Sequence, residues 1–189
     1  MGPDRQLGAL TYSRWFFVAK HEEHQTLESH LSGLFEELRV PLFRYLIVIL
    51  GGTWEAEDVT QECFLRLFLE LRSGKKIGNI RSWLFRVGHN LAIDRWRESP
   101  PEQGLDDAAF NVADDRQPAS DEALIRREQL SMMHAAIGRL SKQQRLCLHL
   151  RTESFRYREI AEILGVSEST VCENIRRGLS RLMRECHEA

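Results

Sequence analysis

The sequence has few of the features that mark secreted, membrane-spanning or zinc-binding proteins. Its four cysteines are Cys63, Cys147, Cys172 and Cys186. Because they form no CxxC pair, we expect reduced thiols in a reducing compartment. The apolar stretch over residues 42–50 is interrupted by Arg44 and is too short to cross a bilayer. Charged residues also break up the apolar cluster over residues 15–19, which argues against a signal peptide. We therefore expect a cytoplasmic protein without membrane insertion.

Signs of catalysis are equally scarce. The sequence contains no Gly-rich phosphate-binding loop, no paired-carboxylate site and no Ser/Cys–His constellation. His21 and His24 have helical spacing, but no third clustered ligand completes a metal site. We therefore predict no metal, no cofactor and no enzymatic activity. The alternative is an enzyme that uses dispersed His and Cys residues with a metal, and a stoichiometric metal in the purified protein would favour it.

The chain also lacks a strong net charge of either sign, because an acidic segment and a basic remainder nearly cancel each other. The formal net charge is −2 over 189 residues. Residues 99–122 hold seven acids against Arg116, a net charge of −6, so the remainder of the chain carries +4. The small net charge therefore hides a charge asymmetry, with basic helical parts separated by an acidic strip, and does not argue against a DNA-binding protein.

Periodicity favours an all-α fold, because apolar residues recur at helical spacing and no strand pattern stands out. We predict an N-terminal extension over residues 1–25 and a first helical domain over residues 26–98, in which Pro41 kinks or splits the first helix. Residues 99–120 carry three prolines and few apolar residues, so we expect a flexible linker there. A second helical domain follows over residues 121–189, and Met133 and Leu140 are among the predicted core residues of its first helix. Asn79 in the first domain, and Ser141 with Gln144 in the second, are predicted helix caps.

A helix-turn-helix unit is predicted at residues 157–182. Ile160, Ala161 and Leu164 form the apolar stripe of a short helix, and Gly165 supplies the left-handed backbone that ends it. Ser167 caps a second helix. In such a unit the second helix enters the major groove of DNA, and the alternative is an ordinary helical hairpin within a core.

Two segments then resemble one family. Residues 58–64 (DVTQECF) and 83–94 (WLFRVGHNLAID) resemble region 2 of bacterial extracytoplasmic-function (ECF) sigma factors of the sigma-70 family, and residues 140–182 resemble their region 4. The resemblance covers residues 27–186 in the expected order. It implies a sigma subunit that binds core RNA polymerase, recognises −35 and −10 promoter elements and promotes DNA melting.

Three sets of site residues follow from the resemblance. A helix that docks on the clamp helices of the largest polymerase subunit would use Asp58, Gln61, Glu62 and Phe64. The −10 element would be contacted by Lys75, Lys76, Arg81, Arg86, Asn90, Arg95, Trp96 and Arg97. The −35 element would be contacted by Ser167, Glu168, Ser169, Thr170, Cys172, Glu173, Arg176, Arg177 and Arg181. Asn90 matches the position that holds a flipped base, since an amide both donates and accepts hydrogen bonds.

The sequence departs from the family pattern in the −35 helix. Many relatives carry Lys-Ser-Arg where this chain has Cys172-Glu173-Asn174, so positive charge is lost and a common −35 motif is not expected. Glu173 could accept a hydrogen bond from a cytosine amine. The resemblance also implies an anti-sigma protein as a partner. The competing hypothesis is a stand-alone helix-turn-helix regulator, which would leave residues 58–64 and 83–90 without a role.

Overall fold

The computed structural model describes the backbone over residues 31–98 and 121–187, and the regular structure in these ranges is helical. The first helix covers residues 31–50. The others are α2 (Thr53–Arg72), α3 (Ile80–Glu98), α4 (Asp121–Gly138), α5 (Lys142–Thr152), α6 (Tyr157–Leu164) and α7 (Glu168–His187). The all-α prediction is confirmed. The predicted extension over residues 1–25, with its histidines, and the predicted linker over residues 99–120 lie outside the described residues.

Helix 31–50, α2 and α3 form the first bundle, and their shared apolar side chains exclude water from its centre. Leu42, Leu46, Val59, Cys63 and Leu84 are fully buried there. The helix runs unbroken through Pro41, so it is not split there, and a kink at Pro41 stays a prediction. Leu38 and Leu42, one on each side of the proline, are buried in the same core, which offsets the missing backbone donor.

A glycine sets how closely α3 approaches its neighbours. A Cβ atom at Gly88 would lie 3.1 Å from Leu42 Cδ1, 3.3 Å from Cys63 Sγ and 3.4 Å from Leu46 Cδ2. The bare backbone of α3 therefore packs against both helix 31–50 and α2, and this close approach fixes the direction in which the side chains of α3 project.

Helices α4 to α7 form the second bundle, and its turns carry the predicted caps. Ser141 Oγ accepts a hydrogen bond from Gln144 N, and Gln144 Oε1 accepts one from Ser141 N, at 3.2 and 3.0 Å. Gly165 ends α6 with φ of 66°, and Ser167 Oγ caps α7 by accepting from Thr170 N at 3.1 Å. The helix-turn-helix is therefore present as predicted.

One burial prediction in α4 is wrong. Met133 was expected in the core but is 44% exposed, whereas Ala136 and Leu140 are buried. The buried face of α4 therefore includes Ala136, is followed by the buried Leu140 just after the helix, and leaves Met133 at the surface.

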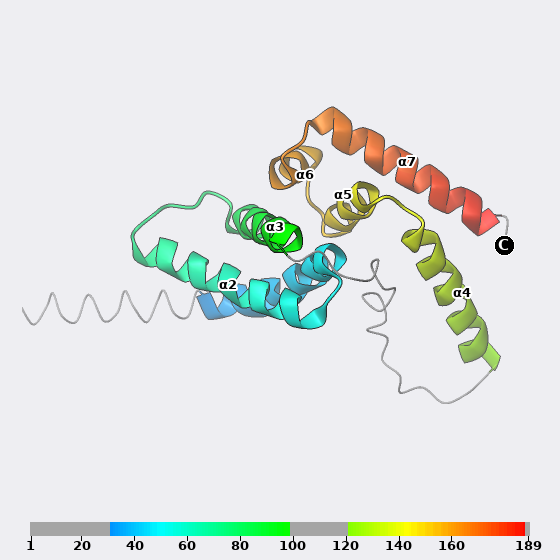
Figure 1. Cartoon of the computed structure of the whole chain (residues 1–189), viewed down its shortest axis with the longest axis horizontal. Helices are drawn as coiled ribbons and strands as arrows, with labels where there is room; N and C mark the ends of the chain where they lie inside the picture. Colours follow the sequence, from blue (N-terminus) through cyan, green and yellow to red (C-terminus); the bar gives the residue numbers. More distant parts are fainter. Residues whose placement is uncertain (1–30, 99–120, 188–189) are drawn as a thin grey trace, which may run out of the picture.

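The two bundles pack against each other (Figure 1). In the picture α3 lies beside α5 and below α6, and the contact between α3 and α6 is extensive. Phe85 of α3 meets Phe155 edge-on, with ring centres 4.9 Å apart. Buried residues of both bundles consequently form one continuous apolar core.

Candidate nucleic-acid interface

Helix α2 presents a polar stripe at the surface of the first bundle, in which Asp58 pairs with Arg95. Asp58 and Gln61 are exposed, and Glu62 is half-buried and pairs with Arg66 at 2.7 Å. Phe64 is only 6% exposed and packs on Phe35 with ring centres 4.8 Å apart. The ring of Phe64 is thus part of the core in this conformation, and other side chains supply the apolar surface of α2.

Sequence reasoning missed that apolar surface. Trp54, Leu65 and Leu69 are 82%, 52% and 53% exposed. Trp54 precedes Asp58 by about one helical turn, Leu65 follows Gln61 by one turn, and Leu69 follows Leu65 by one turn. All three therefore extend the helix face of Asp58 and Gln61. Their signal in the sequence is spacing: they fall outside the buried stripe of Val59, Cys63 and Leu67. Large exposed apolar side chains beside polar ones are typical of a protein-binding surface.

The predicted −10 residues divide into two groups. Lys76, Arg86 and Asn90 are at the surface of the first bundle. The other members have protein partners in this conformation. Lys75 pairs with Glu70, Arg81 with Glu153, Arg95 with Asp58, Arg97 with Asp94, and the Trp96 ring lies 4.1 Å from Lys142 Nζ.

The second bundle holds the start of α3 through Glu159. Asn79 Nδ2 and Ser82 Oγ both donate to Glu159 Oε1, at 3.0 and 3.1 Å. Asn79 Oδ1 also accepts from Ser82 N at 3.0 Å and so caps α3 as predicted. Glu159 Oε2 accepts from Arg156 N at 2.8 Å, which satisfies a backbone donor at the start of α6. One carboxylate therefore connects the first turn of α6 to the first turn of α3.

Arg81 makes the second connection. Its Nη2 donates to the carbonyl of Glu153 at 2.6 Å and to the Glu153 carboxylate at 3.3 Å. A pocket lies between the 75–79 loop and α6, and its lining includes Lys75, Lys76 and Arg86 from the first bundle and Glu162 from α6. The predicted −10 loop thus faces the helix-turn-helix across a partly basic pocket.

An aromatic stack with two histidines crosses the same boundary. Tyr45 is fully buried, its hydroxyl hydrogen-bonds His89 Nδ1 at 2.8 Å, and its ring centre is 5.7 Å from that of His149. Burial, with Lys142 nearby, lowers the pKa of His89 to about 4, and burial, with Arg44 nearby, lowers the pKa of His149 to about 4. Both imidazoles are therefore neutral near pH 7.

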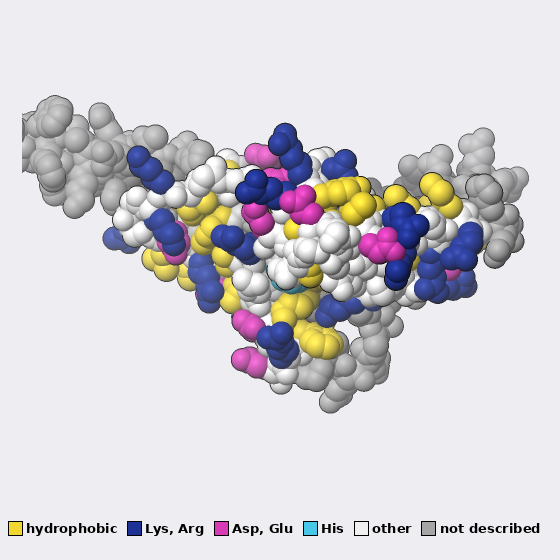
Figure 2. All heavy atoms as spheres, turned by 90° about the horizontal axis from the view of Figure 1, so that it is seen from above, with side chains coloured by type: hydrophobic (Ala, Val, Ile, Leu, Met, Phe, Trp, Pro, Cys, Tyr) yellow, Lys and Arg dark blue, Asp and Glu magenta, His cyan; other side chains and the backbone are white. Residues whose placement is uncertain are grey.

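Helix α7 exposes most of the predicted −35 residues. Val171 and Ile175 are buried and fix which face of the helix points outward. Cys172, Arg176, Arg177 and Arg181 are exposed, as are Ser167, Glu168 and Ser169 at the start of the helix, while Thr170 is half-buried. Figure 2 shows Lys and Arg side chains interspersed with Asp and Glu along the face seen from above, without one uninterrupted basic surface.

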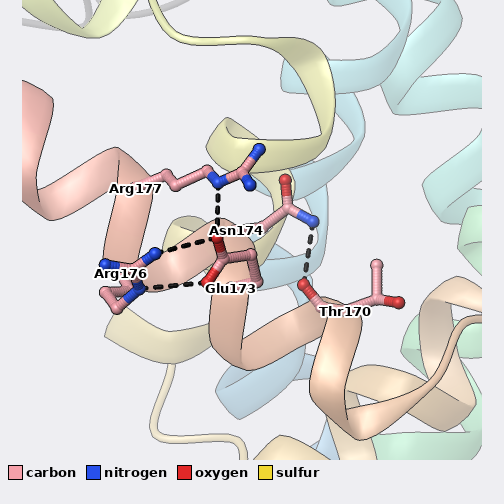
Figure 3. A network of polar contacts seen from close by, with 5 residues as sticks. All are labelled: Thr170, Glu173, Asn174, Arg176 and Arg177. Carbon is pink, nitrogen blue, oxygen red and sulfur yellow. Dashed lines mark hydrogen bonds and ion pairs between the residues drawn. The ribbon is translucent and has the colours of Figure 1, made fainter.

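Glu173 binds two arginines in the N-terminal half of α7 (Figure 3). Its carboxylate accepts from Arg176 and Arg177, and these hydrogen bonds lower its pKa to about 2. Asn174, which sequence reasoning did not include, donates from Nδ2 to the Thr170 carbonyl at 2.8 Å. The exposed face of α7 is therefore a set of mutually oriented polar groups.

Comparisons with known proteins agree with this architecture. A Sigma-70 region 2 family model matches residues 34–99, and a Sigma-70, region 4 model matches residues 130–182. The chain is 29% identical over 151 residues to the ECF RNA polymerase sigma factor SigW of Bacillus subtilis (strain 168), covering 74% of this chain and 80% of the relative. It is 31% identical over 155 residues to the ECF RNA polymerase sigma factor SigL of Mycobacterium tuberculosis (strain CDC 1551 / Oshkosh), covering 75% and 80%.

The fold also has solved counterparts. One is the sigma factor RpoE of Bartonella quintana in complex with the anti-sigma factor NepR, with a TM-score of 0.58 and 23% identity, covering 82% of this chain and 97% of that one. Another is CnrH in complex with the cytosolic domain of CnrY, with a TM-score of 0.57 and 20% identity over 85% and 90% of the two chains.

Region 2 followed by region 4 defines the chain as a sigma-70-type transcription initiation factor. Within that class it belongs to the ECF RNA polymerase sigma factors. Over residues 31–98 and 121–187, no helix is long and apolar enough to span a membrane. Among the side chains that the structure describes, no three of His, Cys, Asp or Glu group as metal ligands would.

Proposed function

We propose that this chain binds core RNA polymerase through α2, reads the −10 element with α3 and the loop before it, and reads the −35 element with α7. The observation that carries this proposal is the order of two sigma-70 regions on one chain, each of which has a helix with exposed polar side chains. The chain recruits and positions the polymerase, while bond formation belongs to the polymerase itself. The protein therefore acts in the cytoplasm and is not an enzyme.

The domain assignment follows the same division. Residues 26–98 serve as the polymerase-binding and −10 domain, residues 99–120 as the linker, and residues 121–189 as the −35 domain. We also infer an anti-sigma protein as a regulator, because a sigma factor of similar fold was solved in complex with an anti-sigma factor. A covering partner of this kind suits a chain whose apolar α2 surface is exposed.

The burial of Phe64 changes which residues of α2 we propose as polymerase contacts. Asp58, Gln61 and Glu62 supply polar contacts to the polymerase, and Leu65 and Leu69 supply the apolar contacts. Phe64 supports this surface from beneath by packing on Phe35. Exposed apolar side chains surrounded by polar ones are the arrangement in which single residues dominate binding energy.

Transcription from a randomised promoter library tests the proposal. Purified bacterial core polymerase is assayed with and without the full-length chain, and start sites are sequenced. We expect starts that appear only with the chain and that share spaced −35 and −10 motifs. If active core polymerase neither binds the chain nor gains promoter-specific starts, the proposed function fails. Specific duplex binding without polymerase would then favour the stand-alone regulator.

Asn90→Ala tests the base pocket on a promoter found in that library. The exposed amide holds an unstacked base through hydrogen bonds, so its loss reduces open-complex formation about tenfold on duplex DNA. The same promoter with an artificially unpaired −10 segment is the control, because the unpairing cost is already removed. A defect equal on both templates would contradict a role for Asn90 in melting.

A further inference from the structure

Glu173 and the two arginines one turn later on α7, Arg176 and Arg177, form an ion-pair network (Figure 3). Arg176 donates twice to Glu173, from Nε to Oε2 at 3.0 Å and from Nη2 to Oε1 at 2.9 Å. Arg177 Nε donates to the same Oε1 at 2.5 Å. The spacing of three and four residues places all three groups on one helix face. Both carboxylate oxygens are therefore engaged, and Arg176 is held in the bidentate geometry.

The network has no large part in folding. Both arginine side chains are 67% exposed and the Glu173 side chain is 38% exposed. Ion pairs at such positions are screened by water and contribute little to stability. The buried residues that hold α7 in place are Val171 and Ile175, on another side of the helix. We therefore expect these three charged groups to serve ligand binding by α7 and not the stability of the fold.

The Glu173 carboxylate lowers the positive charge that this surface presents to DNA. Two arginines alone would present +2 to a phosphate backbone, and with ionised Glu173 the same surface presents +1. Arginine–phosphate contacts release counterions and strengthen binding to any duplex, whatever its sequence. A carboxylate between two arginines therefore weakens sequence-independent binding and fixes where the guanidinium groups point.

We propose that Glu173 is a specificity-determining positioning residue of α7, which orients Arg176 and Arg177 and restrains their attraction to DNA phosphates. The proposal rests on the proposed function of α7 as a reader of duplex DNA. A carboxylate oxygen in an ion pair keeps lone pairs that can accept from a cytosine or adenine amine in the major groove. A duplex that presents such an amine satisfies Glu173. A duplex that presents a base carbonyl at the same position repels the Glu173 carboxylate, because both groups are hydrogen-bond acceptors.

The first test is the salt dependence of binding to a short duplex of unrelated sequence, measured with the full-length chain. Glu173→Gln keeps the shape and removes the charge. We expect the variant to bind this duplex about tenfold more tightly at moderate salt, with a slope of log K against log salt that is steeper by about 1. An unchanged slope would overturn the proposal.

Glu162→Gln is the matched control. Glu162 pairs with Arg158 at 3.1 Å, also four residues apart, on α6 of the same helix-turn-helix. The control removes the same formal charge and the same type of ion pair from outside α7. We expect its salt slope to equal that of the original chain. An equal steepening in both variants would also overturn the proposal, because general charge and not the position of Glu173 would then explain it.

The second test is base preference in the polymerase complex. The −35 library is transcribed with the original chain, Glu173→Gln and Glu173→Asp. We expect Glu173→Gln to lose at least tenfold discrimination at one or two base pairs and to keep preferences elsewhere. Glu173→Asp keeps the charge but shortens the reach, so we expect the original salt slope with altered discrimination. A preference identical in all three proteins would overturn the role of Glu173.

These outcomes separate the two proposals. If the original chain shows no −35 preference with core polymerase, the proposed function itself fails. If the original chain has a preference and Glu173→Gln leaves both preference and salt slope unchanged, only the inference about Glu173 fails. Thermal unfolding of each variant provides the folding check, and the exposed network predicts an unchanged unfolding temperature.

Discussion

The guanidinium carbon of Arg81 lies 4.5 Å from the centre of the Phe155 ring, so a predicted DNA contact of the first bundle covers an aromatic side chain of the second. Phe155 is 2% exposed and also meets Phe85. A cation over an aromatic face is favourable, most of all where water is excluded. The contact makes Phe155 a central packing residue of both bundles.

Phe155→Ala is therefore expected to destabilise the chain by about 3–5 kcal/mol, the cost of deleting a buried phenyl ring. Chemical denaturation measures the loss. Met183→Ala is the control, because Met183 is 63% exposed on α7 and its truncation should change stability by about 0.5 kcal/mol or less. Equal effects of the two substitutions would contradict the packing described for Phe155.

Gly88→Ala should destabilise the first bundle by about 1–2 kcal/mol. The new methyl group would press at once on Leu42 and Cys63, which are fully buried on two different helices and have no room to move. Gly33→Ala is the matched control, since a Cβ atom there meets no atom within 4 Å. We expect the control to stabilise the helix by about 1 kcal/mol. Thermal unfolding gives both values, and a stabilising Gly88→Ala would refute the close packing of α3.

Stability should fall as the pH decreases from about 6.5 to 4. The pKa values of His89 and His149 are lowered to about 4 in the folded chain, while the unfolded chain binds protons near the ordinary value of 6.5. The histidines therefore favour folding fully above pH 6.5, and this contribution is lost below it, by up to about 3 kcal/mol per residue. Denaturation at several pH values measures the slope.

His149→Phe isolates one of the two titrations. His149 Nε2 is buried with no hydrogen-bond partner among the described residues, so a phenyl ring removes an unsatisfied polar atom. We expect equal or higher stability near pH 7 and a clearly smaller loss between pH 6.5 and 4. A pH profile identical to that of the original chain would show that His149 does not contribute to the acid sensitivity.

The exposed apolar residues of α2 should decide polymerase binding. Truncating Leu65 and Leu69 together to Ala is expected to weaken binding to core polymerase at least tenfold, since the few residues that dominate an interface cost more than about 1 kcal/mol each when truncated. Competition against a labelled sigma factor measures the affinity. Leu179→Ala, at an exposed position on α7, is the control and should retain binding. Unchanged affinity of the double variant would exclude this face of α2.

Local sequence signals predicted the turns and caps well, because each depends on a few neighbouring residues. Gly165, the Ser141–Gln144 capping box and the Asn79 cap are all present where the sequence placed them. The sequence could not predict which apolar residues of α2 and α4 stay exposed. Phe64, Leu65 and Met133 are similar in hydrophobicity, and only the position of neighbouring helices decides that Phe64 is buried while the other two are not.

The site was predictable in composition but not in its contacts. The resemblance identified Arg81, Trp96 and Glu173 as DNA-binding candidates, and the role of each remains a prediction. Their present partners Phe155, Lys142 and the two α7 arginines depend on the packing of separate helices or on side-chain orientation. Local sequence patterns do not predict contacts between residues that are up to about seventy positions apart in the chain.

The hydrogen bond from Asn79 to Glu159 affects the affinity for any partner that binds only when α3 and α6 are apart. A partner that needs α3 and α6 apart binds only the fraction of molecules in which this contact is broken. Its apparent dissociation constant is the intrinsic value divided by that fraction. If the joined arrangement were favoured by 99 to 1, binding would weaken about 100-fold. A single substitution at Glu159 would then tighten binding to such a partner without touching its binding surface.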